Sequence, residues 1–438
     1  MLLRQFAPSL LFVAALMQAF KHISVLDLSQ GIAGPVCAGI LARQGANVIK
    51  VEPPHGDWIR ATGNSSEGMS ANAIAGNFNK RGIVLDAGKP AGRAALLTLA
   101  ARADVLVENF RHGVMHKLGL DYATLRALNP RLVMCSITGF GSEGPMKHKA
   151  ATDSVVQAFS GMAVANGTRN TGGTGGTGGS SGTSGTSGSS SGTSDADIAQ
   201  SAEAILPRRI GLYVPDNISA IYAAQAISAA LFERSSSGQG QHVQISLAGC
   251  CAAFQSAPMI DAWLFPPTQA KVAVFAPAGE FRTADGWIVV AAMSAEMFAR
   301  LARAVGREDW LSDARYADSD VRKKYLHEIN AELAAVLAHG TTAAWLTALE
   351  AADVLVSRVN DYAALRSDAQ MQAMGYFATV AQPPYGNVTV PHLPAAARNI
   401  TAAPRAGEHT CAVLREAGLS EAEIDALLAQ GIAMQRES

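Results

Sequence analysis

The sequence lacks the signatures of several large protein classes. Its five cysteines include no C-x-x-C pair, so neither a disulfide framework nor a zinc ribbon fits, and a reducing compartment is expected. No Walker A sequence is present, and no G-x-S-x-G turn marks a serine hydrolase. There is no basic excess either, since 35 Lys and Arg face 36 Asp and Glu, whereas nucleic acids and anionic membranes recruit cationic surfaces. The partners are therefore expected to be small molecules or other protein chains, with no nucleic acid and no membrane.

The chain has enough apolar residues to fold as a globular protein. Of its 438 residues, 49% are apolar and 16% are charged, and this length favours two hydrophobic cores over one. Near the N-terminus, Arg4 precedes an apolar run over residues 10–20 that imitates a secretory signal. The run is too short to span a bilayer, and a strand-like segment begins almost at once, at His22. An extra N-terminal helix or an over-extended start is the alternative to export, and the expected location is cytoplasmic.

Strand-like and helix-like segments alternate over residues 22–140, which is typical of β-α-β units. Strands are expected at ISVLDLS, NVIKVE, VLVENF and RLVMCSIT, and helices at GPVCAGILARQGA and AGRAALLTLAARA. This order predicts an α/β fold with a parallel sheet and helical crossovers. Ligands bind at the carboxyl ends of such strands, so the loops after VLDLS, VIKVE, VLVENF and MCSIT are the first candidates for a site.

Composition divides the rest of the chain. Residues 171–194 are only Gly, Ser and Thr, so they are expected to form a flexible loop, either a natural insertion or a cloning linker. Near Pro266 and Pro267 the chain is expected to leave the first domain. Ser420 and Glu423 form a capping-box signature on a final helix that is expected to pack back on the large domain. The expected division is an extension over 1–21, a large domain over 22–265 with 366–438, and a small domain over 266–365.

Two short motifs have simple structural explanations. Residues 139–144 match G-x-G-x-x-G, but Pro145 follows, and no acidic residue ends a second strand at the distance that a dinucleotide site needs. A glycine turn is the better interpretation. His112 and His116 are spaced i, i+4, yet they lack the Glu of H-E-x-x-H and a third ligand. We interpret them as surface histidines and expect no metal site.

Two carboxylates precede helix-like segments. Asp216, in GLYVPDNISA, follows a short apolar segment and comes directly before an alanine-rich helix, which predicts an N-cap position. A carboxylate there accepts backbone N–H bonds and lies at the positive end of the helix, so Asp216 is expected to stay ionised. Asp153, in ATDSVVQAFSG, is placed similarly. A purely structural cap is the alternative for both residues.

Several long segments, in order, closely resemble the family III CoA-transferases. This group (CaiB/BaiF, formyl-CoA transferase-like) also contains the α-methylacyl-CoA racemases. The resemblance covers nearly everything from residue 22 onward except the Gly/Ser/Thr run. It rests on VLDLSQGIAGPVCAGILARQGANVIKVEPPHGD, NFNKRGIVLD, ADVLVENFRHGVMHKLGLDYATLRALNPRLVMCSITGFGSEGP, ALFERSSSGQGQHVQISL, the ADGW segment and SEAEIDALLAQG.

The resemblance implies a fold and a set of site residues. The fold would be a Rossmann-like large domain built from both chain ends, a small α+β domain between them, and an intertwined homodimer. The catalytic nucleophile would be Asp216, with Asp153 in a supporting role and Gly279 nearest to the glycine-rich lid of some transferases. Pro53 and Pro54 replace a basic residue often found after the second strand. The family's CoA contacts would fall on Ile32, Ala33, Leu85, Asn109, Phe110 and Lys117.

The implied reaction moves CoA from an acyl-CoA to a small carboxylic acid. This exchange is nearly isoenergetic, so it needs neither ATP nor a tightly bound cofactor, in agreement with the missing nucleotide motifs. An ionised aspartate attacks without a general base and forms a covalent aspartyl-CoA intermediate. The alternative is a 2-methylacyl-CoA racemase, but Thr152 stands where racemases of this group carry a His before the Asp. A CoA-binding scaffold without turnover is the third hypothesis.

Overall fold

The computed structural model describes residues 18–169, 205–265, 274–394, 396 and 398–436. The chain divides into two compact units, Met1–Met259 with Ala378–Ser438, and Ile260–Phe377. The first unit therefore joins segments from both ends of the sequence. The Gly/Ser/Thr run at 171–194, most of the N-terminal extension and the two prolines at 266 and 267 lie outside the described residues.

A seven-stranded sheet forms the centre of the first unit. Its strand order is β10-β7-β6-β1-β2-β5-β16, and every pairing is parallel except that of β16 with β5. The expected parallel sheet with helical crossovers is confirmed. The strands are β1 (Ser24–Asp27), β2 (Asn47–Glu52), β5 (Lys80–Leu85), β6 (Val105–Glu108), β7 (Val133–Thr138), β10 (His242–Ser246) and β16 (Ala433–Met434).

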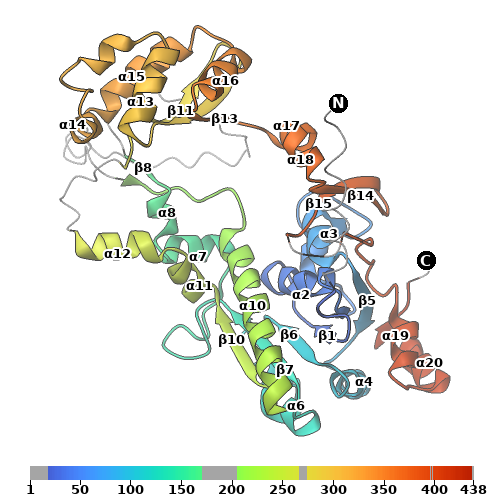
Figure 1. Cartoon of the computed structure of the whole chain (residues 1–438). Helices are drawn as coiled ribbons and strands as arrows, with labels where there is room; N and C mark the ends of the chain where they lie inside the picture. Colours follow the sequence, from blue (N-terminus) through green and yellow to red (C-terminus); the bar gives the residue numbers. More distant parts are fainter. Residues whose placement is uncertain (1–17, 170–204, 266–273, 395, 397, 437–438) are drawn as a thin grey trace, which may run out of the picture. The chain divides into compact units, whose positions relative to one another are not determined.

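Alternate residues of the strands belong to two hydrophobic cores, one on each face of the sheet. Val25, Val105 and Val133 pack with α2 (Ala33–Arg43), α10 (Val214–Ser237) and α11 (Leu247–Phe254). Leu26 and Leu106 face the other side, against α4 (Pro90–Ala100), α19 (Thr410–Glu416) and α20 (Glu421–Ala429). Figure 1 shows α10 running alongside α2. The final helix has the expected capping box and packs on the large sheet.

Shorter elements complete the first unit. The helices are η1 (Trp58–Ala61), α3 (Ala71–Asn77), α5 (Val114–Lys117), α6 (Tyr122–Leu128), α7 (Asp153–Phe159), α8 (Met162–Ala165) and α12 (Ser256–Leu264, which continues into the second unit). The strand pairs are β3 (Ser65–Ser66) with β4 (Met69–Ser70), β8 (Thr168–Arg169) with β9 (Ile205–Leu206), and β14 (Phe377–Gln382) with β15 (Gly386–Pro391).

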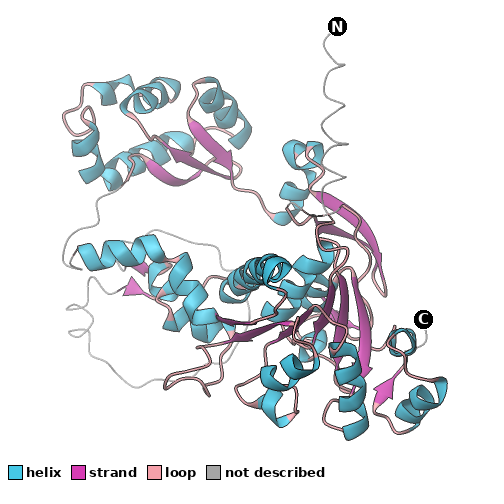
Figure 2. Ribbon diagram, turned by 60° about the horizontal axis from the view of Figure 1, so that its bottom comes forward, coloured by secondary structure: helices cyan, strands magenta, loops and turns pink. Residues whose placement is uncertain are grey.

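The second unit is a small α+β layer. Its antiparallel sheet joins β11 (Ala278–Arg282), β12 (Trp287–Ala291) and β13 (Leu355–Arg358). Figure 2 shows helices gathered against these strands, and Ile288 and Val290 are fully buried in the shared core. The helices are α13 (Ala295–Ala304), η2 (Glu308–Leu311), α14 (Ser319–Lys324), α15 (Leu326–Leu337), α16 (Thr342–Ala351), α17 (Tyr362–Ser367) and α18 (Ala369–Ala373).

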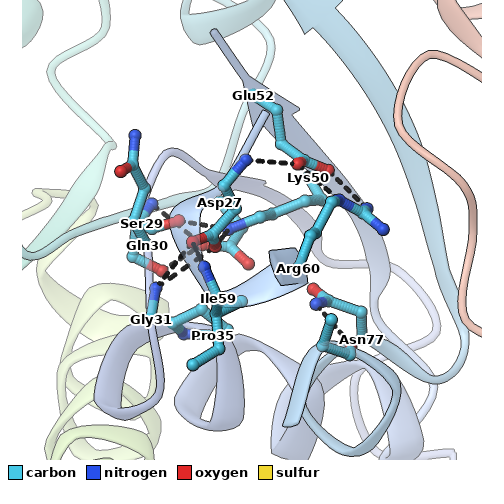
Figure 3. Close-up of polar contacts among 12 residues, drawn as sticks. Asp27, Ser29, Gln30, Gly31, Pro35, Lys50, Glu52, Ile59, Arg60 and Asn77 are labelled. Atoms are coloured by element: carbon cyan, nitrogen blue, oxygen red, sulfur yellow. Dashed lines mark hydrogen bonds and ion pairs between the residues drawn. The ribbon is translucent and has the colours of Figure 1, made fainter. Parts of the chain in front are cut away.

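A buried ion pair lies beneath the loop that follows β1 (Figure 3). The Asp27 carboxylate accepts a hydrogen bond from Lys80 Nζ at 2.7 Å, and both side chains are fully buried. Lys80 Nζ also donates to the Pro35 carbonyl oxygen at 2.8 Å and to Asn77 Oδ1 at 3.0 Å. Burial raises the pKa of Asp27, but Lys80 and Lys50 outweigh it and hold that pKa below its usual range. Burial lowers the pKa of Lys80 to about 8, although Asp27 opposes the shift.

Lys50 connects this pair to the loop itself. Its Nζ donates to the Ser29 carbonyl oxygen and to Asp57 Oδ2, the latter at 3.0 Å. The Asp57 carboxylate in turn accepts from the backbone N–H of Gly31 at 3.0 Å and of Ile59 at 3.1 Å. The loop after β1 is therefore fixed from below by charged side chains and not by apolar packing alone.

Glu52 and Arg60 fix the loop after β2 in the same way. Arg60 donates twice to the Glu52 carboxylate, at 2.7 and 2.6 Å, in the two-point geometry that the guanidinium plane favours. The same carboxylate accepts the Asp57 backbone N–H at 2.8 Å. Asp57 is thus held by its own backbone as well as by Lys50.

Replacing Lys80 by methionine should destabilise the fold strongly. The change leaves the buried Asp27 carboxylate without its closest cation, and losing one partner of a buried pair costs about 3–5 kcal/mol. The matched control is Arg81→Met on the same strand, because the Arg81–Glu416 pair is solvent-accessible and should contribute about 1 kcal/mol or less. Urea unfolding of both variants measures the difference, and equal losses would contradict this role for Asp27 and Lys80.

Candidate active site

A cavity of about 610 Å³ opens at the carboxyl ends of the central strands, within the first unit. Three of the four loops predicted to carry a site contribute to it, those after β1, β6 and β7; η1 beyond β2 and the starts of α7 and α10 complete the wall. Its polar lining residues are Gln30, Thr62, Asn109, Arg111, His112, Thr138, Lys147, His148, Lys149, Thr152, Asp153, Ser154, Tyr213 and Asp216.

Asp216 lies in this wall, but its place on the helix differs from the expected one. It is the third residue of α10, whose N-cap is Tyr213, and no side chain of that cap accepts a hydrogen bond from the helix. Pro215 is the second residue of the helix, and its fixed φ suits the first turn. The helix therefore begins before Asp216. The prediction of an N-cap aspartate is therefore wrong, although Asp216 does sit in the first turn.

Asp153 supplies the acceptor that Tyr213 does not. It begins α7, and its Oδ2 accepts the backbone N–H of Asp216 at 3.3 Å. The first N–H groups of a helix have no partner within the helix, so a carboxylate from a neighbouring helix is stabilised there. The two aspartates are thereby brought together at the meeting point of α7 and α10.

The surroundings of Asp216 favour its neutral form more than the sequence predicted. Burial, together with the like charge of Asp153, raises the pKa of Asp216 to about 7. Burial also raises the pKa of Asp153, against hydrogen bonds from Gln157 and the Asp216 N–H and the charge of Arg209. The expectation that the helix end keeps Asp216 ionised is thus corrected, because burial and the like charge of Asp153 both raise its pKa. A carboxylate that ionises near neutral pH in a desolvated wall is a stronger nucleophile than an exposed one.

The loop after β1 is hydrogen-bonded to the loop after β6, the strand that pairs with β1. Asn109 Oδ1 accepts the Gln30 N–H at 2.7 Å, and Asn109 Nδ2 donates to the Gln30 carbonyl oxygen at 2.6 Å. Gly31 follows with φ of +78°, and a side chain there would meet the Trp58 ring at 2.6 Å. The Asn109 amide and the buried charges below Gly31 therefore hold the same loop from two directions.

Cationic side chains gather along one part of the cavity. Arg111 follows β6, while Lys147 and Lys149 come from the loop after β7. Lys149 Nζ lies 5.6 Å from the centre of the Phe140 ring, and the His112 and His148 rings meet edge to face at 4.8 Å. Such a rim suits phosphate or carboxylate groups of a ligand.

The structure places the other residues implied by the resemblance in different surroundings. Ile32, Ala33, Asn109 and Phe110 line the cavity. Two others do not: Leu85 is buried in β5 opposite Ala433, and Lys117 is exposed at the end of α5. Gly279 belongs to the second unit, in β11. The assignment of the first six residues to CoA contacts and of Gly279 to the lid stays a prediction.

A second cavity of about 320 Å³ shares Phe110, Arg111, His112 and Thr138 with the first. At its base, burial raises the pKa of Glu108, and Ser136 Oγ is 2.8 Å from His242 Nε2. Within the described ranges no three His, Cys, Asp or Glu side chains are grouped as metal ligands. In the same part of the chain, no helix is long and apolar enough to cross a membrane.

Sequence reasoning missed the basic rim and the burial of Gln157. The available signal for the rim was the Lys147-His148-Lys149 triplet shortly after the glycine turn. Gln157 carried no signal, because a glutamine within an amphipathic helix is ordinary; only the fold shows that it faces inward at 1% exposure.

Comparison with known proteins agrees with this site. Residues 20–410 match the family described as CoA-transferase family III. The chain is 32% identical to a succinate–glutarate CoA-transferase of Agrobacterium fabrum over 81% of this chain and 83% of that protein. It is 28% identical to a mouse succinyl-CoA:glutarate CoA-transferase over 96% of this chain and 92% of the other. The crystal structure of a CaiB/BaiF family protein from Brucella suis superposes with a TM-score of 0.74 at 28% identity, covering 90% and 98% of the two chains.

The family match spans most of the chain, the relatives carry the same activity name, and the parallel sheet and cavity agree with the expectation from the motifs. The chain therefore belongs to CoA-transferase family III.

Proposed function

We propose that the protein transfers CoA from an acyl-CoA to a carboxylic acid through a covalent intermediate on Asp216. The observation that carries this proposal is the state of Asp216: a largely buried carboxyl group with a pKa of about 7, in the wall of a 610 Å³ cavity with a cationic rim. A carboxylate needs no base to attack a thioester, and desolvation makes its ionised form more nucleophilic.

The reaction follows from this one nucleophile. A carboxylate oxygen of Asp216 attacks the acyl carbonyl carbon, the C–S bond breaks, and CoA leaves as a thiolate, which gives a mixed anhydride. The thiolate attacks the aspartyl carbonyl carbon and releases the donor acid, leaving an aspartyl-CoA thioester. The acceptor carboxylate then attacks this thioester, and the same two steps in reverse produce the new acyl-CoA and free Asp216. Every step transfers one acyl group, so no oxidant, reductant or net proton is consumed.

Binding energy from the remote part of CoA lowers these barriers. The nucleotide portion carries phosphates, and Arg111, Lys147 and Lys149 offer cationic partners for them or for the acid. Such binding, far from the reacting carbon, offsets the cost of forming each anhydride. The residues Ile32, Ala33, Leu85, Asn109, Phe110 and Lys117 stay our candidates for CoA contacts, Gly279 for the lid, and Asp153 for a supporting role.

The acids are proposed from the relatives. Several relatives are named for succinate or succinyl-CoA together with a second dicarboxylic acid, such as glutarate or D-citramalate. A dicarboxylate has a free carboxylate that the cationic rim can hold while the other end reacts. We therefore propose succinyl-CoA as donor and a short dicarboxylic acid as acceptor.

Proton exchange at the α-carbon is the alternative activity. It needs two acid–base groups on opposite sides of the substrate, and Asp216 titrates in the required range. The residue before Asp153 is Thr152, whose hydroxyl is not an acid–base group near neutral pH, and the nearest His in the sequence is His148, which also lines the cavity. We therefore place the racemase second to the transferase.

We also propose that the active protein is an intertwined homodimer. Trp287, Val289 and Leu355 are 42%, 39% and 49% exposed on the open face of the β11-β12-β13 sheet, opposite the buried Ile288 and Val290. These exposed apolar side chains, which share the face with Glu280 and Arg282 of the paired strand, fit a surface that a partner covers. A cytoplasmic location is proposed as well, because all five cysteines are free thiols.

The covalent step predicts an adduct on Asp216. Incubation with succinyl-CoA and no acceptor should add the mass of CoA less one water to the peptide that contains Asp216, with succinate as the leaving acid, and hydroxylamine should remove the CoA. Asp216→Ala and Asp216→Asn should abolish both adduct and exchange. Asp153→Asn, the matched control, should form the adduct more slowly. Peptide mass spectrometry decides, and transferase activity in Asp216→Ala or an adduct on Asp153 would refute the assignment; deuterium uptake at the α-carbon without acyl exchange would establish the racemase instead.

The raised pKa predicts a pH dependence. The nucleophile must be ionised, so kcat/KM should fall as the pH drops through about 7, the pKa of Asp216. Asp153→Asn removes a like charge, which lowers the pKa of Asp216 and moves the acidic limb of the profile to lower pH. Steady-state rates between pH 5 and 9 measure both profiles. A limb that moved to higher pH in Asp153→Asn would contradict the proposed coupling.

The proposed dimer predicts the mass of the protein in solution and a sheet face on which an added charge weakens the association. Light scattering should give twice the chain mass of 45.5 kDa. Val289→Glu places a charge on the exposed sheet face and should weaken the dimer, whereas Glu280→Gln on the neighbouring strand should not. A wild-type protein that is monomeric and active at micromolar concentration would overturn the proposal.

A further inference from the structure

Gln157 is a buried amide with an unusual number of partners. It lies in α7 at 1% exposure. Its Nε2 donates to Asp153 Oδ1 at 2.7 Å and lies 3.1 Å from the carbonyl oxygen of Leu212 and 3.3 Å from that of Ile210. Its Oε1 accepts the Ile210 N–H at 2.8 Å. Both ends of this amide are therefore used.

These bonds reach Asp216 along two routes. Through the side chains, Gln157 holds one oxygen of Asp153, whose other oxygen accepts the Asp216 N–H at 3.3 Å. Through the backbone, it holds residues 210–212, the segment that leads directly into the first turn of α10. The Gln157 amide thus fixes the Asp153 carboxylate beside Asp216 and also the segment 210–212 that precedes α10.

Other ionisable groups also face this pair. The positive charge of Arg209 lowers the pKa of Asp153, and the Arg209 guanidinium donates a hydrogen bond to Ser154 Oγ. The Cys251 thiol of α11 lies within electrostatic reach of both aspartates. Burial is the main cause that raises its pKa to about 11, so the thiol stays neutral. The cavity side carries Lys147, His148 and Lys149. In the part of the chain that the structure describes, none of these groups donates a hydrogen bond to Asp153, whereas Gln157 does.

We propose that Gln157 is a positioning residue for Asp216, acting through Asp153 and through the segment that enters α10. This proposal rests on the proposed function, because it assigns Asp216 as the nucleophile. The amide N–H bonds to the ionised form of Asp153 and so favours the charge that faces Asp216. Gln157 thereby helps to set the pH at which the nucleophile ionises, without touching the substrate.

The test replaces the amide by an apolar side chain of similar length, Gln157→Met. Without the N–H donor Asp153 is less ionised, its repulsion of Asp216 weakens, and the acidic limb of kcat/KM should move to lower pH by about one unit. It should move in the same direction as in Asp153→Asn. Because residues 210–212 lose their anchor, kcat should fall about tenfold to a hundredfold, while KM for succinyl-CoA changes much less.

Gln255→Met is the matched control. Gln255 is also buried, and its Nε2 donates to the carbonyl oxygens of Ser160 and Cys251, yet it has no bond to either aspartate. Its loss should affect the melting temperature and leave the acidic limb in place. In the double variant Asp153→Asn/Gln157→Met the limb should lie where it lies in Asp153→Asn alone, because the amide acts through that carboxylate.

A second substitution keeps the test decisive if Gln157→Met does not fold. Gln157→Glu preserves shape but adds a negative charge beside Asp153, so the acidic limb should move to higher pH, opposite to the methionine variant. A folded Gln157 variant whose limb coincides with that of the wild type overturns the proposal. Failure of the proposed function is distinct, because it would appear in the wild type as the absence of both CoA exchange and adduct.

Discussion

The buried ion pairs under the β1 loop are the constraint on which the cavity depends. The side chains of Asp27, Lys50 and Lys80 have no exposed surface, and taking charges out of water is costly unless each finds its partners. Here the partners include backbone groups of the loop, so the charges are satisfied only when that loop has one conformation. The wall of the cavity that carries Ile32 and Ala33 is therefore fixed before any ligand arrives. Preorganisation of this kind reduces the ordering cost of binding.

The second constraint is the meeting of α7 and α10. Each helix begins beside the cavity, and each contributes one aspartate to the same place. Helix starts offer unpaired N–H groups, which favour a carboxylate, while burial and a second carboxylate oppose it. The balance leaves Asp153 as the acceptor of a helix N–H and Asp216 as the group that titrates near neutrality. Two chemically identical side chains are thereby given different tasks.

Much of the fold was predictable from the chain. Period and strand length indicated β1, β2, β6 and β7 as strands of a parallel sheet, since apolar runs such as VLVE are long enough for a buried strand and too short for a helix. Their order in the sheet was not predicted. The capping box at Ser420 marked the start of α20 within one residue. In contrast, Tyr213 and not Asp216 is the N-cap of α10, because Pro215 already belongs to the helix. The local sequence pattern does not show how deeply a side chain is buried. It therefore indicated Asp216 as a candidate but did not predict the raised pKa of Asp216. Nor could it show that Asp57 and Gly31, 26 residues apart, are bonded.

The length of α10 has a mechanical consequence. The first turn of the helix holds Asp216 at the cavity. Arg234, 18 residues later, is buried and donates to Asp104 and to the Arg131 carbonyl oxygen. At 1.5 Å per residue, these two points are about 27 Å apart along a stiff rod. A tilt of about 2° at the Arg234 end therefore displaces the other end by about 1 Å, enough to slow a reaction that depends on alignment. The helix behaves as a lever whose clamp lies at the amino ends of β6 and β7, at the far end of these strands from the cavity, so the position of the Asp216 carboxylate is set in part by the buried Arg234 guanidinium.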